Sequence, residues 1–181
     1  MRIIRGSLSR KRLKAPKNLP VRPTTDMAKE ALFNILDNQY YFEDLKVLDL
    51  CSGTGNIAYE FASRGSEHIV AVDRDPNCVK FIKSTAEDLD LNAVLQVVQS
   101  DMFEFLEKSN QSFDLIFADP PYDFEDYNTL VDAILESDQL NPEALVIIEH
   151  PKQTSFDTHP FFEQERKYGK VHFSFFSKSS Q

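Results

Sequence analysis

The fold of this chain is decided by the stretch Lys46-Val47-Leu48-Asp49-Leu50-Cys51-Ser52-Gly53-Thr54-Gly55-Asn56. Its first five residues are mainly apolar and predict a buried strand. The next six contain two glycines, which allow a tight turn and let a ligand approach the backbone closely. An amphipathic helix is predicted over residues 57–64, with Gly65 ending it. A helix N-terminus after a glycine-rich turn can receive a negative group, so the stretch predicts a ligand site on an α/β fold.

The rest of the chain continues this alternation of strands and helices. Strands are predicted over residues 69–73, 94–98, 113–118 and 144–149, and helices over residues 76–89, 101–107 and 127–136. An earlier helix begins at Thr24 or Thr25. Its predicted apolar face comprises Ala28, Ala31, Leu32, Ile35 and Leu36. The last two strands, residues 161–167 and 171–176, are joined around Gly169 too tightly to be parallel. The predicted fold class is α/β with three layers, in which a mostly parallel sheet ends in an antiparallel C-terminal hairpin.

The N-terminal segment is strongly basic. Residues 1–30 carry nine of the 20 Lys and Arg and two of the 29 acids, whereas the whole chain has a net charge of −9. A basic arm on an acidic body indicates a polyanionic partner, and the alternative is a solvated basic tail. Residues 1–23 are predicted to form this arm or hairpin, and residues 24–181 one globular domain. The residues expected to neutralise phosphates are Arg5, Arg10, Lys11, Arg12, Lys14 and Lys17.

The composition disfavours several classes of protein. No apolar run approaches the roughly 20 residues of a transmembrane helix, and none has the form of a signal peptide. We therefore expect a cytoplasmic protein with no membrane partner. Cys51 and Cys78 have no metal-ligand spacing and are predicted to be free thiols, and the four histidines are scattered along the chain. We expect a monomer without a bound metal.

Acidic residues stand at the ends of the first three predicted parallel strands. Asp49 lies beside the glycine-rich turn, Asp73 is placed to hold ribose hydroxyls, and Asp101 is placed to accept from an adenine amine. The pattern Gly53-x-Gly55-x-x-Ala58 also matches a dinucleotide fingerprint, so NAD competes as the ligand. Asp49 would repel a pyrophosphate but attract an ammonium group. S-adenosylmethionine carries an ammonium, a sulfonium, a ribose and an adenine, so the pattern favours it over NAD.

A second motif, Asp119-Pro120-Pro121-Tyr122, follows the strand predicted over residues 113–118. Neither proline has a backbone N–H, so the strand must stop with Asp119 at its carboxyl end. Ligands bind at the carboxyl ends of strands in open α/β sheets. A carboxylate, unpaired carbonyl groups and an aromatic ring suit a flat polar group, such as a nucleobase with an exocyclic amine. The alternative is a capped strand-to-loop turn with no function.

These motifs, in this order, resemble those of the Rossmann-like class I S-adenosylmethionine-dependent methyltransferases. The motif at residues 119–122 resembles the branch that methylates amino groups of adenine, cytosine or guanine. Further segments are similar to the RsmD-type 16S ribosomal RNA guanine-N2 methyltransferases, and the similarity covers essentially the whole chain. These segments are Arg2-Ile3-Ile4-Arg5-Gly6, Arg22-Pro23-Thr24-Thr25-Asp26, Leu32-Phe33-Asn34 and Tyr168-Gly169. Cys51-Ser52 departs from the family pattern, which has an aromatic and a small residue there.

The resemblance implies methyl transfer by direct displacement to N2 of a guanine in 16S ribosomal RNA, free or in the small ribosomal subunit. Asp119 and the Pro120 carbonyl would accept the amine hydrogens, and Tyr122 would stack on the extruded base. The implied catalytic residues are Asp119, Pro120, Pro121 and Tyr122. The implied cofactor residues are Asp49, Cys51, Gly53, Gly55, Asn56, Asp73, Arg74, Asp101, Met102 and Asp119. The implied RNA-binding residues are Arg5, Arg10, Lys11, Arg12, Lys14, Arg22 and Thr24.

Three other functions compete with this interpretation. A DNA adenine-N6 or cytosine-N4 methyltransferase would share the pocket but usually needs an added recognition domain. An NAD-dependent oxidoreductase would need a catalytic His, Tyr or Lys, and none stands at a fitting place. A non-catalytic RNA-binding assembly factor would not need the intact acids. Cys51 is expected to be structural rather than a nucleophile, and the roles of Glu149 and His150 stay open.

Overall fold

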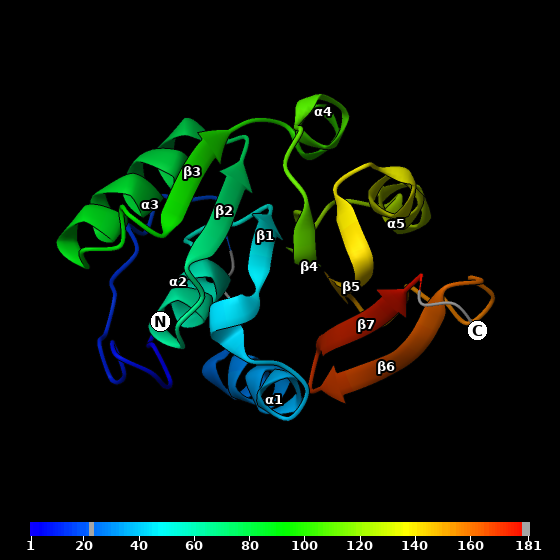
Figure 1. Cartoon of the computed structure of the whole chain (residues 1–181), viewed down its shortest axis with the longest axis horizontal. Helices are drawn as coiled ribbons and strands as arrows, with labels where there is room; N and C mark the ends of the chain where they lie inside the picture. The colour runs from blue at the N-terminus through cyan, green and yellow to red at the C-terminus, as the bar shows by residue number, and fades with distance from the viewer. Residues whose placement is uncertain (22–23, 179–181) are drawn as a thin grey trace.

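A mixed β-sheet runs through the centre of the molecule (Figure 1). The computed structural model describes residues 1–21 and 24–178. The strands are β1 (Lys46–Leu50), β2 (His68–Asp73), β3 (Leu95–Gln99), β4 (Phe113–Ala118), β5 (Leu140–His150), β6 (Phe162–Tyr168) and β7 (Val171–Ser177). They lie in the order β3-β2-β1-β4-β5-β7-β6. The pairs among β1 to β5 are parallel, and β7 is antiparallel to both β5 and β6. This topology confirms the predicted sheet and its C-terminal hairpin.

Helices cover both faces of the sheet. They are α1 (Asp26–Asp37), α2 (Asn56–Ser63), α3 (Pro76–Asp88), α4 (Met102–Lys108) and α5 (Tyr127–Glu136), with a short 3-10 helix η1 (Phe42–Asp44). Side chains alternate across each strand. One set of strand side chains packs with α1, α2 and α3, and the other set packs with α4 and α5. Figure 1 shows α4 and α5 together, away from α1 and α2. The three predicted layers are therefore confirmed.

The helices begin where the local sequence predicts. Thr25 caps α1 by accepting a hydrogen bond from the Ala28 N–H at 3.2 Å. Asp75 caps α3 in the same way, and Pro76 occupies its first position. Asp101 caps α4. None of the described helices is long and apolar enough to cross a membrane.

Tertiary packing changes three of the sequence predictions. The helix α2 is predicted to be amphipathic, but all eight of its residues are buried because the N-terminal segment covers its outer face. In α1, Lys29 and Phe33 are buried, whereas Ala31 and Ile35 of the predicted face stay partly exposed. Strand β5 begins at Leu140 rather than at residue 144, because it pairs with Phe113 before a bulge.

The N-terminal segment folds back on itself. The Ile3 N–H donates to the Lys11 carbonyl at 3.0 Å, and the Arg10 N–H donates to the Ile3 carbonyl at 2.9 Å. Only an isolated antiparallel bridge, between Arg2 and Arg12, forms in this part of the chain. The described part of this segment is therefore a hairpin closed by backbone hydrogen bonds, without regular strands.

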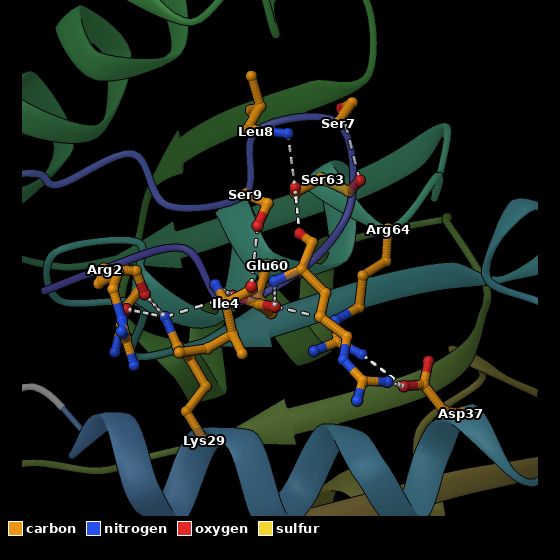
Figure 2. A network of polar contacts seen from close by, with 12 residues as sticks. Arg2, Ile4, Ser7, Leu8, Ser9, Lys29, Asp37, Glu60, Ser63 and Arg64 are labelled. Carbon is orange, nitrogen blue, oxygen red and sulfur yellow. Dashed lines mark hydrogen bonds and ion pairs between the residues drawn. The ribbon is translucent and has the colours of Figure 1, made fainter.

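The helix α2 holds this segment through its polar side chains (Figure 2). The Glu60 carboxylate accepts hydrogen bonds from the backbone N–H groups of Ile4 and Arg5, at 2.9 and 3.1 Å. The Ser63 hydroxyl donates to the Arg5 carbonyl at 2.5 Å. Gly6 has a φ of +87°, and a Cβ there would overlap the Ser63 carbonyl. Glycine is needed at this position for the segment to reach α2.

A buried ionic cluster lies beneath the same contact. Lys29 and Glu60 are fully buried, with Nζ 3.4 Å from the carboxylate. Lys29 also donates to the Arg2 carbonyl at 2.6 Å and to the Asn56 side chain at 2.8 Å. Arg64 donates to Glu60 at 2.9 Å. Burial lowers the pKa of Lys29, and the nearby Glu60 opposes that shift. Since the Glu60 carboxylate meets two cations and two backbone N–H groups, the cluster joins α1, α2 and the N-terminal segment.

Glu60→Ala should lower the free energy of unfolding by about 3–5 kcal/mol, because it leaves the buried Lys29 ammonium without its carboxylate. Urea unfolding measures this change. Glu104→Ala removes the exposed pair with Lys108 and should leave the stability unchanged within error. A loss at Glu60 no larger than at Glu104 would contradict the role given to the cluster.

Candidate active site

Three acids stand in one row at the carboxyl edge of the sheet. In the β1–β2, β1–β4 and β4–β5 pairings, the last paired residues all lie at the same height along the strand direction. Asp73, Asp119 and Glu149 each come one residue after that level. Residues in register on parallel strands point to the same face. For this row it is the face that α1, α2 and α3 cover, because Phe117 and Ile147, two residues earlier, pack there.

A fourth acid, Asp49 of β1, lies on the same face and is 1% exposed. Its carboxyl accepts the Ala58 N–H of α2 at 3.2 Å. The Asp73 carboxyl accepts the backbone N–H groups of Gly53 and Asp75, both at 2.8 Å. The glycine-rich turn is thus held between the ends of β1 and β2, as the sequence predicts for a ligand loop.

The geometry of that turn depends on its glycines. Gly53 and Gly55 have φ values of +57° and +78°. A Cβ at Gly55 would lie 2.7 Å from the Tyr59 ring, so no other residue fits there without movement. Asn56, which follows, is buried, and its amide donates to the Thr24 carbonyl at 3.1 Å. The Asn56 side chain is therefore occupied by the protein, and any ligand contact from it would come through the backbone.

The acids are not compensated by cations. In residues 1–21 and 24–178, none of the four carboxyls forms a salt bridge. Burial, and to a lesser extent Asp73, raise the pKa of Asp49 to about 8. Burial followed by Glu149 and Asp49 raises the pKa of Asp119 well above its usual range. Burial raises the pKa of Glu149 to about 7. This edge therefore favours ligands that bring positive charge or hydrogen-bond donors.

Cys51 lies among these acids, with a φ of +59°. Its Sγ is 3.4 Å from the Met102 sulfur. Burial, with Asp73 and Asp119, raises the pKa of the Cys51 thiol far above neutrality. Because the thiolate is the nucleophilic form, this thiol is unsuited to covalent catalysis.

The motif at residues 119–122 forms a turn beyond β4. The Asp119 N–H donates to the Leu50 carbonyl at 3.3 Å, and the Phe124 N–H closes the turn on the Pro121 carbonyl at 2.9 Å. Within the described residues, the Asp119 carboxyl and the Pro120 carbonyl accept no hydrogen bond. Tyr122 is 87% exposed. The turn therefore offers free acceptors beside an exposed ring.

The other predicted site residues are more scattered. Arg74 is exposed and Asp101 is partly buried, with its carboxyl accepting from the Phe103 N–H at 2.9 Å. Arg5 pairs with Asp37 at 3.2 Å. Within the described part of the basic segment, several exposed side chains form no salt bridge, among them Arg10, Lys11, Arg12 and Lys14. Arg22 lies outside the described residues.

Sequence reasoning missed the partnership of Thr24 and Glu149. Thr24, predicted to bind RNA, is buried, and its hydroxyl donates to Glu149 Oε2 at 2.6 Å. The two residues are 125 positions apart, so only the position of Glu149 at a strand end could have indicated it. His150 points to the opposite face, where its ring nitrogen lies 2.7 Å from the Ser174 hydroxyl, and it is not part of the row.

The sequence model of the family described as Conserved hypothetical protein 95 matches residues 1–177. The chain belongs to this family. The match spans both the basic N-terminal segment and the row of acids, and it confirms the resemblance to the RsmD-type proteins.

Several relatives of this chain have names that refer to ribosomal RNA. The chain is 36% identical over 156 residues to a Bacillus subtilis protein named "Putative rRNA methyltransferase YlbH", covering 84% of each chain. It is 27% identical over 185 residues to the Escherichia coli K12 ribosomal RNA small subunit methyltransferase D, covering 100% of this chain and 91% of that protein.

Solved structures share the fold over nearly the whole chain. A hypothetical protein of Thermus thermophilus, TTHA0928, has a TM-score of 0.85 and 28% identity, covering 97% of this chain and 98% of its own. A Salinibacter ruber RNA methyltransferase in complex with S-adenosyl-L-homocysteine has a TM-score of 0.66 at 18% identity, with coverage of 88% and 95%. The second likeness concerns the fold alone, and it agrees with the predicted α/β fold with a mostly parallel sheet.

Asp49→Asn should stabilise the unliganded chain in a pH-dependent way. The folded pKa of Asp49, about 8, lies above its ordinary value of 3.8, so the acid favours folding at low pH and loses this contribution as the pH rises toward 8. Asparagine cannot ionise, so the variant should gain more than about 1 kcal/mol at pH 8 and little near pH 4. Urea unfolding across this range measures the difference. Asp138→Asn, on an exposed acid, is the control, and a gain at Asp49 that does not change with pH would contradict the account.

Proposed function

We propose that this chain methylates the exocyclic N2 of a guanine in 16S ribosomal RNA, with S-adenosylmethionine as methyl donor. The observation that carries the proposal is the row of partly buried acids, without a salt bridge in residues 1–21 and 24–178, in which Asp119 opens the turn at residues 119–122. The names of the relatives support ribosomal RNA as the substrate class. The cytoplasm is the expected compartment.

The donor set at the edge of β1 and β2 fits S-adenosylmethionine. Asp49 is a buried acid with no cationic partner in the described residues, so an ammonium group would offset its charge. The Asp73 carboxylate has about four acceptor sites, and two backbone N–H groups use only part of them. Asp73 can therefore still accept from two ribose hydroxyls, and Asp101 can accept from an adenine amine. When bound, S-adenosylmethionine supplies an electrophilic methyl group on a positively charged sulfur.

The turn at residues 119–122 would orient the amine that attacks this methyl group. The Asp119 carboxyl and the Pro120 carbonyl are free acceptors for its two hydrogens. Holding both hydrogens directs the nitrogen lone pair, which is otherwise delocalised into the ring, toward the methyl carbon. The nitrogen would bond to the methyl carbon as the methyl–sulfur bond breaks with its electron pair left on sulfur, and the nitrogen would lose one of its two hydrogens as a proton to the Asp119 carboxylate. Tyr122, exposed at the rim, is available to stack on a base taken out of its helix.

The basic segment supports RNA as the partner. Arg10, Lys11 and Arg12 are exposed and carry no salt bridge in the described part of the chain, so they are free to neutralise phosphates. The segment is also fixed to α2, which begins at the cofactor loop. RNA bound to the segment would therefore lie in a constant relation to the transfer site.

Methyl transfer from labelled S-adenosylmethionine to naked 16S RNA, to small ribosomal subunits and to duplex DNA tests the proposal directly. Nucleoside analysis of the product should yield N2-methylguanosine from an RNA substrate. Product from DNA, as N6-methyladenine or N4-methylcytosine, would favour the competing amino-methyltransferase. No transfer to any substrate would favour the non-catalytic assembly factor.

Asp119→Ala should lower methyl transfer by at least roughly 100-fold, because the amine loses its charged acceptor. Binding of S-adenosylmethionine, measured by calorimetry, should be largely retained. Asp123→Ala changes an exposed acid on the same loop and should keep full activity. Normal turnover in the Asp119 variant would remove this residue from the mechanism.

Reversing the charges of Arg10, Lys11 and Arg12 to Glu should weaken RNA binding and flatten its dependence on salt. The matched control reverses Arg166, Lys167 and Lys170 on the β6–β7 hairpin, at the other edge of the sheet. Binding curves at several salt concentrations compare the two. Equal effects of both variants would mean that the N-terminal segment has no special part in RNA binding.

A further inference from the structure

Glu149 is the direct neighbour of Asp119. The strands β4 and β5 are parallel, with Ala118 paired to Ile148, so the next residue on each strand is an acid at the same level. Both side chains point to the same face. The electrostatic influence of Glu149 on the Asp119 carboxyl agrees with this proximity. A base whose amine meets Asp119 would therefore also meet Glu149.

The Thr24 hydroxyl fixes the orientation of Glu149. It donates to Oε2 at 2.6 Å, whereas Oε1 accepts no hydrogen bond within residues 1–21 and 24–178. Thr24 is itself held, because its carbonyl accepts the Asn56 amide at 3.1 Å. One carboxylate oxygen is thus occupied and aligned by the protein, and the other has no hydrogen-bond partner among the described residues.

The bases with exocyclic amines differ in the ring nitrogen beside the amine. In guanine, N2 lies next to N1–H, which is a donor. In adenine and in cytosine the amine lies next to a ring nitrogen with a lone pair, which is an acceptor. In their ionised form, which donors on a bound base would favour, two neighbouring carboxylates can accept from two neighbouring donors but would repel an acceptor. The pair formed by Asp119 and Glu149 therefore matches the guanine edge.

We propose that Glu149 selects guanine at the transfer site, with Oε1 accepting the N1–H while Asp119 accepts one of the N2 hydrogens. This inference rests on the proposed methyl transfer to guanine and assigns a specificity-determining residue to it. Thr24 acts as the residue that positions Glu149. The guanine edge also gives Asp119 and Glu149 Oε1 the donors that residues 1–21 and 24–178 do not supply.

The test compares guanine with an analogue that lacks both the N1 proton and the 6-oxo group, and the change of preference in the Glu149 variant isolates the N1 contact. An RNA fragment carries either the target guanine, identified by nucleoside analysis, or 2-aminopurine at that position. The 2-aminopurine base keeps the amine but has an unprotonated N1. The wild-type protein should prefer guanine by roughly 100-fold in kcat/KM, because the analogue leaves Glu149 facing a lone pair.

Glu149→Gln should reduce this preference by at least roughly 10-fold, because an amide can present either an oxygen or an N–H to the base. Glu143→Gln, in the same strand but exposed, should keep the wild-type preference. If Glu149 had only a structural role, the variant would methylate both substrates more slowly by the same factor. The ratio of the two kcat/KM values would then stay constant, which would overturn the inference. Thr24→Val keeps the acid but frees it, and should lower the preference even if the Glu149 variant does not fold.

Failure of the proposed function gives a different result. In that case the wild-type protein methylates neither RNA, so no ratio can be formed. If the wild-type protein methylates guanine but accepts 2-aminopurine equally well, guanine transfer stands and the assignment of Glu149 falls.

Discussion

The parallel register of β2, β4 and β5 is the constraint on which the site depends. It brings Asp73, Asp119 and Glu149 to one level and directs them to one face, where Asp49 is already buried. Burial makes ionisation of these acids costly, and neighbouring acids of the group add to this cost at Asp49 and Asp119. A fold selected only for stability would not keep such a group. The free-energy cost of keeping these acids together is consistent with a site, at the carboxyl edge of the sheet, that is completed by a ligand carrying positive charge and hydrogen-bond donors.

The helix α2 contrasts with this edge because its buried charge is fully compensated. Glu60 meets Lys29, Arg64 and two backbone N–H groups, so burial there produces a firm attachment for the N-terminal segment. The same helix begins at the glycine-rich turn. A continuous set of hydrogen bonds joins the Arg2 carbonyl through Lys29 and Asn56 to the Thr24 carbonyl. The basic segment, the glycine-rich turn and the Thr24 that holds Glu149 are therefore joined by one continuous set of hydrogen bonds.

Much of the site could be predicted because its residues stand at strand ends. Asp49 and Asp73 follow apolar runs, and two prolines after Asp119 require the strand to stop. Local sequence also placed the start of α1 at Thr24 or Thr25, and the structure has Thr25 as its cap. By contrast, Lys29 appears as a solvent-facing residue in the helical pattern, and only the acid of α2 makes its burial possible. The ion pair that occupies Arg5 likewise depends on Asp37 of another element.

The sequence by itself determined the order of elements, the mostly parallel sheet, the glycine-rich turn and the acids that end its strands. These features follow from local rules, namely apolar periodicity, the missing N–H of proline and the free φ of glycine. Only the tertiary structure decided that Thr24 holds Glu149, that Lys29 and Glu60 are buried together, and that α2 is covered on all sides. The physical reason is that such contacts join residues far apart in the chain, so they exist only when register and packing bring two surfaces together.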